Sequence, residues 1–468
     1  MNTVFIAPGY LSHYATLFRG RFIEHLSSQH RVIVLTRDME LADAERRGYY
    51  TGHNMVYERV PFHQKLLWDI FDAYIRLAFA REHDFSVVNR SWWYKKSHPI
   101  EKRILNHIGG IFPSRWMKSE YMTALERFFA RPSPRFRSLV ERYRPSLLIT
   151  ATPGISPYET ELIHYAKSLG VPQVAIDMNF DHPEGMSKFL RKTDYVGAWS
   201  ERMKRQSEVY QRFAPDRIKV IGCLRFDHFF NLVKEGKVRS REEFLISKRL
   251  NPRKKTLSYF TSTPISYPPR REFMEGFIGL KQKKLLSGDP NIFVRLHPHD
   301  LWAPYEPFKN IPEVHIERAG TLYLDDQQET KGWKVDMTAE DYRNTTETFL
   351  YTDLLINYSS TTTIEAAIFG KDTIGIYYPA SVNQFFNYEQ EEHQFSVNAG
   401  VLSLARSLDE LKNLINLHLD GNKTGDKDRH RRVVEYFMQF TDGRNWERAV
   451  QWIDEIIARE SGQGAAPQ

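Results

Sequence analysis

Short apolar runs that end at glycine, proline or serine recur along the whole chain, and amphipathic segments follow them. This alternation is the pattern of strands and helices built around parallel sheets. The clearest apolar runs in the two halves of the chain are Val4–Ala7, Arg31–Leu35, Ser146–Thr150, Gln173–Ile176, Thr256–Phe260, Ile292–Arg295, Leu354–Ile356 and Thr373–Ile376. The sequence therefore predicts an α/β protein made of two Rossmann-like halves.

Length and composition agree with a two-domain globular protein. The chain has 468 residues, of which 41% are hydrophobic and 26% charged. These proportions of hydrophobic and charged residues are typical of a globular protein and exclude a disordered chain or a coiled coil. No apolar run reaches the roughly 20 residues that span a bilayer, and the N-terminus lacks the pattern of a secretory signal. Cys223 is the single cysteine, which fits a reducing cytoplasm, and the net charge of +7 favours anionic partners. We expect a cytoplasmic location.

Changes in composition suggest where the domains begin and end. A polar segment rich in Lys, Arg and Glu follows the first half and resembles a linker rather than a core. An aspartate cap followed by apolar residues at helical spacing predicts a last helix. The predicted parts are a first domain at 1–235, a linker at 236–255, a second domain at 256–440, a C-terminal helix at 441–458 and a frayed tail at 459–468.

Residues 84–145 interrupt the alternation and predict a helical insertion, rich in aromatic and basic residues, in the first domain. One interpretation is that its aromatic residues form the core of extra helices and its cations are solvated. Another is a surface for a membrane or a lipid-linked acceptor, because Trp and Tyr lie at headgroup level among cations. A nucleic-acid platform is a third interpretation, which we do not favour. The segment 91–118 is the predicted contact with an anionic membrane surface.

Hydroxyl residues follow the strand predicted near 354–356 and open a helix. Ser359, Ser360 and Thr361 suit a phosphate or diphosphate, because a helix start adds free N–H groups and a positive dipole. Glu365, one turn later, is placed to accept hydrogen bonds from ribose hydroxyls. Ordinary helix capping is the alternative explanation for the hydroxyls.

Arg295 and His297 lie at the end of the strand predicted at 292–295, just before a proline. Ligand sites in open parallel sheets form at the carboxyl ends of strands. Arg295 suits bidentate phosphate contact, and His297 suits donation to a phosphate or protonation of a leaving group. Read alone, a His-Pro pair is more often a structural turn, but the hydroxyl block elsewhere in the sequence reverses this balance in favour of a ligand site.

Two glycine-containing segments are candidates for further contacts in a cleft. Gly222 and Arg225 follow a strand at the end of the first half, where a structural turn with Asp227 as a helix cap is an equal alternative. Gly9 follows the first strand and lets backbone approach a ligand, and His13 comes shortly after it. His13 is otherwise an exposed loop histidine.

The ordered set of short motifs over 146–455 resembles GT-B fold glycosyltransferases. It comprises Val-Ile-Gly-x-x-Arg-Phe-Asp at 220–227, Arg-x-His-Pro at 295–298, Asn-Tyr-Ser-Ser at 357–360, Glu365 with Gly370, and Asp-Gly at 442–443. Within that fold it is similar to the bacterial surface-polysaccharide group: CDP-glycerol glycerophosphotransferases, capsule Kdo transferases and sialyltransferases. The resemblance implies two Rossmann-like domains facing a central cleft. It also implies that Arg295 and His297 contact the donor phosphates, that Ser359 to Thr361 bind the phosphate, and that Glu365 holds ribose.

One departure from the glycerophosphotransferases concerns their Trp-His-Gly-Thr segment. Here the corresponding stretch is residues 176–185, which puts glycerol phosphate as the transferred group in doubt. This stretch follows a strand and supplies carboxylates and an imidazole, the groups that a general base requires. The candidates for that base are Asp177, Asp181, His182 and Glu184.

These features predict a glycosyltransferase that moves a sugar from a cytidine or uridine nucleotide to a saccharide or lipid-linked acceptor in bacterial surface-polysaccharide synthesis. The one Asp-x-Asp, at 426–428, has no strand before it, so we expect no metal site and no cofactor beyond the nucleotide-sugar substrate. Alternatives are a polyol-phosphate transferase, a non-hydrolysing sugar-nucleotide epimerase, and a basic membrane- or nucleic-acid-binding protein on an inactive transferase scaffold. Retaining GT-B enzymes often carry a second glutamate eight positions before the one that Glu365 resembles, whereas position 357 here is asparagine. The resemblance therefore mildly favours inversion, while the similarity to Kdo transferases leaves retention open.

Overall fold

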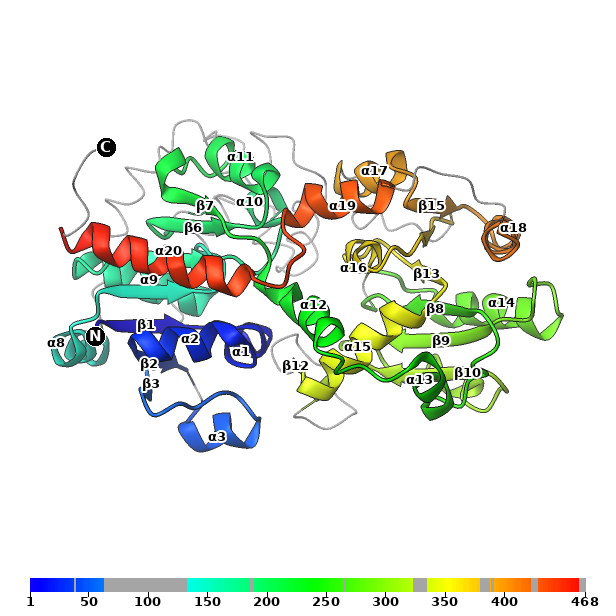
Figure 1. The fold of residues 1–468 in the computed structure, drawn as a ribbon, viewed down its shortest axis with the longest axis horizontal. Coiled ribbons are helices and arrows are strands. Elements are labelled where there is room, and N and C mark those ends of the chain that lie inside the picture. The colour runs from blue at the N-terminus through cyan, green and yellow to red at the C-terminus, as the bar shows by residue number, and fades with distance from the viewer. Residues whose placement is uncertain are drawn as a thin grey trace, which may run out of the picture. The chain divides into compact units, whose positions relative to one another are not determined.

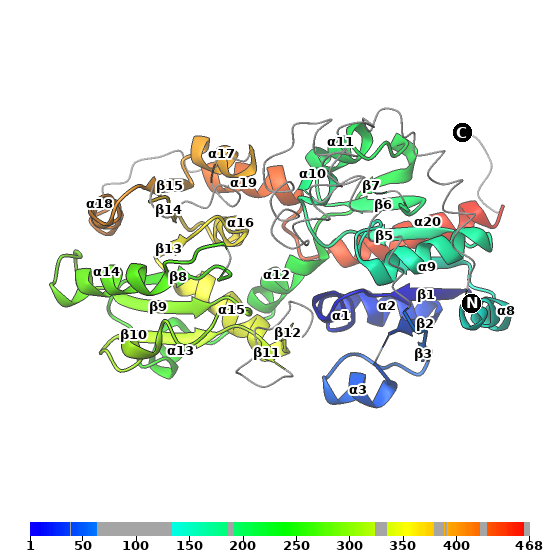
Figure 2. The same ribbon diagram turned by 180° about the vertical axis from the view of Figure 1, so that it is seen from behind.

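The computed structural model describes residues 1–37, 39–62, 133–185, 189, 191–264, 266–322, 335–378, 388, 391–421 and 428–462. The chain forms two compact units. The N-terminal unit comprises Met1–Asp227 together with Phe437–Gln468, and the C-terminal unit comprises His228–Tyr436. Each unit has its own parallel sheet with helices on both faces (Figures 1 and 2), so the prediction of two Rossmann-like halves is confirmed.

The sheet of the N-terminal unit has the strand order β3-β2-β1-β4-β5-β6-β7, and all its pairs are parallel. The strands are β1 (Thr3–Ala7), β2 (Arg31–Thr36), β3 (Met55–Arg59), β4 (Leu147–Thr150), β5 (Gln173–Ile176), β6 (Tyr195–Ala198) and β7 (Ile218–Val220). The chain starts at β1, extends the sheet to β3, and then returns beside β1 with β4. The topological switch point, where ligands bind in such sheets, therefore lies between β1 and β4.

Successive residues of β1 point to opposite faces of this sheet, and both faces are covered. Val4 and Ile6 lie in one apolar cluster, which includes residues of α1 (Leu11–Phe18), α2 (Arg21–Gln29) and α20 (Asn445–Glu460). Phe5 and Ala7 lie in the other cluster, with α8 (Pro134–Tyr143) and α9 (Pro157–Ser168). Burial on both faces explains why the strand sequences are continuous apolar runs. The other helices of the unit are α3 (Leu41–Arg46), α10 (His182–Gly185), α11 (Glu201–Val209) and the 3₁₀ turns Pro215–Arg217 and Leu224–Phe226.

Helix α20, from the C-terminal end of the chain, packs on the N-terminal unit (red in Figure 1). Ala449, Trp452, Ile453 and Ile456 have helical spacing and fill the cluster beside α2. The helix was expected at 441–458 as a separate segment after the second domain. Its apolar stripe instead completes the core of the first.

The sheet of the C-terminal unit has the order β10-β9-β8-β13-β14-β15 and is also parallel. Its strands are β8 (Thr256–Phe260), β9 (Asn291–Leu296), β10 (Val314–Arg318), β13 (Leu354–Asn357), β14 (Thr373–Ile376) and β15 (Leu402–Ala405). A short antiparallel ribbon joins β11 (Thr321–Leu322) to β12 (Val335–Asp336). The switch point of this sheet lies between β8 and β13.

The segment 236–255, predicted to be a linker, belongs to the C-terminal unit. It contains α13 (Arg241–Ser247), whose Phe244 and Leu245 are buried with Leu250 and Phe293 of β9. Phe244, Leu245 and Leu250 are thus the three apolar residues of this cluster that anchor the otherwise polar segment. The other helices here are α12 (Asp227–Lys234), α14 (Arg270–Gln282), a 3₁₀ turn at Glu306–Phe308, α15 (Ala339–Tyr351), α16 (Thr362–Ile368), α17 (Glu391–Asn398), α18 (Leu408–Leu419) and α19 (Arg429–Met438).

Most of the predicted insertion, including the segment 91–118, lies outside the described residues. Its last part is α8, where Phe136 and Leu139 are buried in the N-terminal core. None of the described helices is both long and apolar enough to cross a membrane.

Candidate functional site

The loops after β8, β9 and β13 lie at one edge of the C-terminal sheet, because these three strands are parallel neighbours. The loop after β8 carries Thr261, and Tyr267 from the same connection packs against Tyr358 after β13, with ring centroids 4.7 Å apart. The two sequence motifs predicted to bind the donor follow β9 and β13. Topology therefore brings both motifs to the edge at which open α/β sheets bind ligands.

The turn that carries His297 is held by buried hydrogen bonds. The His297 N–H donates to Thr261 Oγ1 (2.8 Å), and the Thr261 hydroxyl donates to Asp300 Oδ2 (2.6 Å). Asp300 also accepts from the Tyr305 hydroxyl (2.6 Å) and pairs with Arg270. The His297 ring accepts at Nδ1 from the N–H of His299 (3.1 Å), which places the proton of a neutral ring on Nε2. The turn is thus preorganised with His297 only partly buried.

Arg295 occupies a different environment from the one its motif predicts. Its side chain is 3% exposed and forms an ion pair with Glu317 of β10. A second guanidinium nitrogen donates to Thr345 Oγ1 of α15 at 2.5 Å. These contacts satisfy the guanidinium inside the unit, so they favour a structural role over the predicted contact with donor phosphates.

Ser359 has an unusual backbone conformation directly after β13. Its φ of +38° lies in the left-handed region, which non-glycine residues rarely adopt. Its N–H donates to the Tyr388 hydroxyl (2.7 Å), which in turn donates to the carbonyl of Asn357 (3.0 Å). Its Oγ lies 3.0 Å from Nε2 of His393, whose pKa burial lowers to about 4. Backbone strain held in place by such contacts is typical of functional sites.

The rest of the hydroxyl block is organised by local hydrogen bonds. Ser360 Oγ accepts from the N–H of Thr362 (3.3 Å), and the Asn357 amide donates to the hydroxyls of Thr362 and Thr363, both at 2.9 Å. Thr361 precedes α16 without a capping side-chain bond. Glu365 lies in the first turn of α16 and is 5% exposed. The ribose contact predicted for Glu365 stays a prediction.

The switch point of the N-terminal unit contains a carboxylate that the sequence motifs did not reveal. Glu159 of α9 is fully buried, and its Oε1 accepts from the N–H of Gly9 (2.7 Å) and lies 3.2 Å from Nδ1 of His13. Gly9 is required here, because a Cβ at this position would lie 2.1 Å from Ser156 Oγ. His13 is 6% exposed and forms a buried pair with Glu159. The alternative interpretation of His13 as an exposed loop histidine is therefore wrong.

A second histidine–carboxylate pair follows β5. Asp177 Oδ1 is hydrogen-bonded to Nδ1 of His182, and both side chains are buried. Burial opposes the charged ring, but the attraction and hydrogen bond of Asp177, helped by Asp181 and Glu159, raise the pKa of His182. For Asp181, by contrast, burial itself raises the pKa of the carboxyl group. Three of the four predicted base candidates therefore lie together, near enough to Glu159 for its charge to act on His182.

The fourth base candidate, Glu184, accepts hydrogen bonds from Arg202 (2.9 Å) and from Gln206, both on α11. This pairing favours a structural role. Gly222 has a φ of +83° and lies against Asn445 at the start of α20, and Asp227 accepts from the N–H of Trp446 (2.9 Å). Asp227 therefore caps α20 rather than the helix that follows it in the sequence. Arg225 is exposed beside this joint, and its predicted cleft contact stays a prediction.

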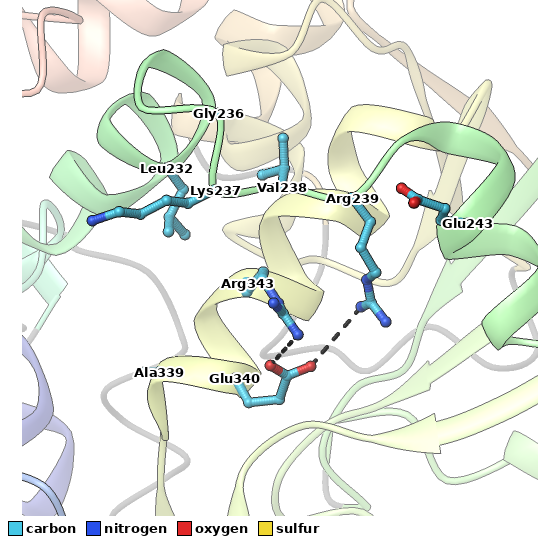
Figure 3. Close-up of a pocket in the computed structure, with 9 residues that line it drawn as sticks. All are labelled: Leu232, Gly236, Lys237, Val238, Arg239, Glu243, Ala339, Glu340 and Arg343. Carbon is cyan, nitrogen blue, oxygen red and sulfur yellow. Dashed lines mark ion pairs between the residues drawn. The ribbon is translucent and has the colours of Figure 1, made fainter.

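A pocket of about 560 Å³ lies elsewhere in the C-terminal unit, between the α12–α13 connection and the start of α15 (Figure 3). Arg239 pairs with the buried Glu347 (2.5 Å), and Arg343 pairs with Glu340 (2.6 Å). The two arginines that line the pocket are therefore already neutralised by carboxylates. No sequence motif pointed to it. Within the described residues, no group of three or more His, Cys, Asp or Glu side chains is arranged to hold a metal ion.

Comparison with known proteins identifies the fold. No protein-family description and no curated protein sequence matches the chain. Among solved structures, UDP-GlcNAc 2-epimerase from Neisseria meningitidis, bound to UDP-GlcNAc, matches with a TM-score of 0.55 and 10% identity, covering 97% of this chain and 99% of the other. The enzyme from Methanocaldococcus jannaschii matches with a TM-score of 0.52 and 11% identity over the same shares.

The chain has the GT-B fold. The wall teichoic acid polymerase TagF also matches, at 12% identity over 98% of this chain and 90% of the other, with a TM-score of 0.45. The two epimerase structures confirm the fold expected from the short motifs, and at 10% and 11% identity they establish the fold alone.

Proposed function

We propose that this protein is a glycosyltransferase that moves a sugar from a cytidine or uridine nucleotide to a saccharide or lipid-linked acceptor in bacterial cell-surface polysaccharide synthesis. The C-terminal unit binds the donor and the N-terminal unit supplies the base. The acceptor oxygen attacks the anomeric carbon, the bond from that carbon to the phosphate oxygen breaks, and the nucleotide leaves with the electron pair. The acceptor proton passes to the base.

The arrangement at the edge of the C-terminal sheet carries this proposal. The hydroxyl-bearing loop after β13 and the fixed His297 turn after β9 flank β8, at the switch point. Hydroxyl donors and an imidazole N–H at this edge suit the negative charge that develops on a leaving phosphate. Because His297 is fixed through its backbone and its Nδ1, it costs little reorganisation as that charge develops.

The edge of the N-terminal sheet supports the other half of the reaction. A general base needs an imidazole or carboxylate whose orientation is fixed, and this edge holds two histidines, each bound at Nδ1 by a buried carboxylate. The sugar, the acceptor and any contact with a membrane surface belong to the proposal.

An epimerase is the second candidate. Two histidine–carboxylate pairs at one sheet edge also suit a reaction that removes a proton from a sugar and returns one to it. The solved structures that share the fold over nearly the whole chain include UDP-GlcNAc 2-epimerases.

Product analysis separates the two candidates. UDP-GlcNAc, CDP-glycerol and CMP-sialic acid are each incubated with the protein, alone and with a lipid-linked saccharide acceptor, and the products are resolved by chromatography. We expect nucleotide release that depends on the acceptor. An epimerised nucleotide sugar formed from UDP-GlcNAc alone would refute the transferase assignment and support the epimerase.

A further inference from the structure

The pair formed by His13 and Glu159 joins the two strands of the N-terminal switch point. His13 lies in α1 directly after β1, and Glu159 lies in α9 after β4. The Glu159 carboxylate accepts hydrogen bonds from the Thr152 hydroxyl and from the N–H groups of Gly9 (2.7 Å) and Ala151 (3.4 Å), besides its contact with His13. Glu159 therefore ties the ends of β1 and β4 together and holds the His13 ring by its Nδ1.

This contact fixes the proton on the His13 ring. A carboxylate accepts hydrogen bonds, so Nδ1 of His13 is the protonated nitrogen and Nε2 of the neutral ring carries the lone pair. Among the described residues, Nε2 has no protein hydrogen-bond partner. A fixed imidazole with an available lone pair is the arrangement that a general base requires.

His182 differs from His13 in how its carboxylate is used. Asp177 gives one oxygen to the His182 ring, and from the rest of the described residues its side chain accepts only a 3.4 Å contact from the N–H of Asn179. The negative charge of Glu159 is shared among four donors, whereas that of Asp177 acts mainly on His182. Asp177 thus favours the protonated form of His182, in agreement with the raised pKa of this ring. A ring that keeps its proton near neutral pH is a hydrogen-bond donor rather than a base.

We propose that His13 is the general base of the reaction, that Glu159 is the residue that positions it, and that His182 acts as a charged donor to the bound acceptor. This inference rests on the proposed transferase function. In the transfer step, Nε2 of His13 takes the proton of the acceptor hydroxyl as its oxygen bonds to the anomeric carbon and the nucleotide leaves. His13 becomes an imidazolium, which Glu159 stabilises, and it later loses the proton to water.

The test compares His13→Gln with His30→Gln. His30 is a matched control, because it is a buried histidine of the same unit whose Nε2 lies 2.7 Å from Asp454, but it precedes β2 at the opposite edge of the sheet. Nucleotide release is measured against pH with the active donor among UDP-GlcNAc, CDP-glycerol and CMP-sialic acid. We expect His13→Gln to lower kcat by about 10²- to 10⁴-fold and to remove the acidic limb of the pH profile. Nucleotide affinity, measured by calorimetry, and the melting temperature should stay close to wild type.

Full activity of His13→Gln, or an equal loss in His30→Gln, would overturn the assignment of the base while leaving the transferase proposal standing. Failure of the wild type to turn over any of the three donors would overturn both. A ¹⁵N spectrum of the histidine rings gives a readout that needs no substrate. We expect His13 to show a protonated Nδ1 and an unprotonated Nε2 in its neutral form, and the opposite tautomer would contradict the proposal.

Discussion

Replacing Gly222 with alanine should destabilise the N-terminal unit well beyond the usual cost of such a change. The backbone φ of +83° costs an alanine about 1–2 kcal/mol. The new Cβ would lie 1.9 Å from Oδ1 of Asn445, which is fully buried. Overpacking of this kind costs a further ~1–3 kcal/mol.

Movement of Asn445 to relieve the clash breaks further contacts. Its amide nitrogen donates to Asp227 Oδ1 (2.7 Å) and to the carbonyl of Cys223 (3.1 Å), each worth roughly 1 kcal/mol. The expected loss of unfolding free energy is therefore about 4 kcal/mol or more. The contacts that are lost are those that attach α20 to the rest of the N-terminal unit.

Gly170→Ala is the matched control. Gly170 has a φ of +71° in the same unit, but a Cβ there meets nothing within 4 Å, so this variant should lose only the backbone cost of about 1–2 kcal/mol. Differential scanning calorimetry should show Gly222→Ala melting roughly 5 °C or more below Gly170→Ala, since 1 kcal/mol corresponds to about 2–4 °C in a unit of this size. Equal melting temperatures for the two variants would refute the packing of α20 described above.

Further predictions separate structural residues from functional ones. Arg295→Ala should lower the stability of the C-terminal unit by about 1.5–3 kcal/mol, because it removes a buried ion pair while Lys248 and His315 still contact Glu317, and calorimetry measures this. His297→Ala should instead keep the melting temperature, and steady-state kinetics with the donor should show a loss of transition-state stabilisation of about 2–4 kcal/mol. Unchanged kinetics would show that the His297 turn has only a structural role. Burial raises the pKa of Asp227 to about 7, so the folded protein holds a proton there that the unfolded chain releases near pH 4, and stability should fall as pH rises from about 4 to 7. The melting temperature of Asp227→Asn should depend less on pH over this range, and an unchanged dependence would contradict the assignment. The protein should co-sediment with anionic liposomes, and salt should weaken this binding. A variant with Lys95, Lys96, Arg115 and Lys118 changed to glutamine should bind more weakly, because each cation contributes roughly 1 kcal/mol of attraction. Equal binding of the two proteins would favour the interpretation as extra core helices.

Much of the fold could be predicted because the central strands are buried on both faces. Such strands read as continuous apolar runs, and every run identified in the sequence is a strand in the structure. Strands β3, β10 and β15 were missed because each contains partly exposed positions and lacks a continuous apolar run. Strand β6 was also missed, although all four of its residues are buried. The attachment of α20 to the N-terminal unit could not be predicted from the local sequence, because it depends on a hydrogen bond between Asp227 and Asn445, which are 218 positions apart.

The candidate site was predictable where a motif follows a strand and unpredictable where a helix supplies the residue. His13, Asp177 and His182 follow strands and were candidates from the sequence. Glu159 was missed because a glutamate in an amphipathic helix usually faces solvent. A signal was available, since Glu159 has helical spacing with the buried Leu162, Ile163 and Ala166, on the apolar face of α9. Arg295 shows the converse, because an arginine in a strand buried on both faces requires an internal partner, which Glu317 provides.

Nucleotide binding tests the central claim most directly. Melting temperature is measured with CMP, CDP, UDP, GDP and ADP, each in EDTA and again with manganese, because a ligand that binds only the folded state raises apparent stability. We predict a clear rise with a cytidine or uridine nucleotide that persists in EDTA and is lost when Ser359 and Ser360 are both changed to alanine. No rise with any nucleotide, or a rise that EDTA abolishes and manganese restores, would contradict the account of a nucleotide-sugar enzyme whose C-terminal unit binds its donor without a metal.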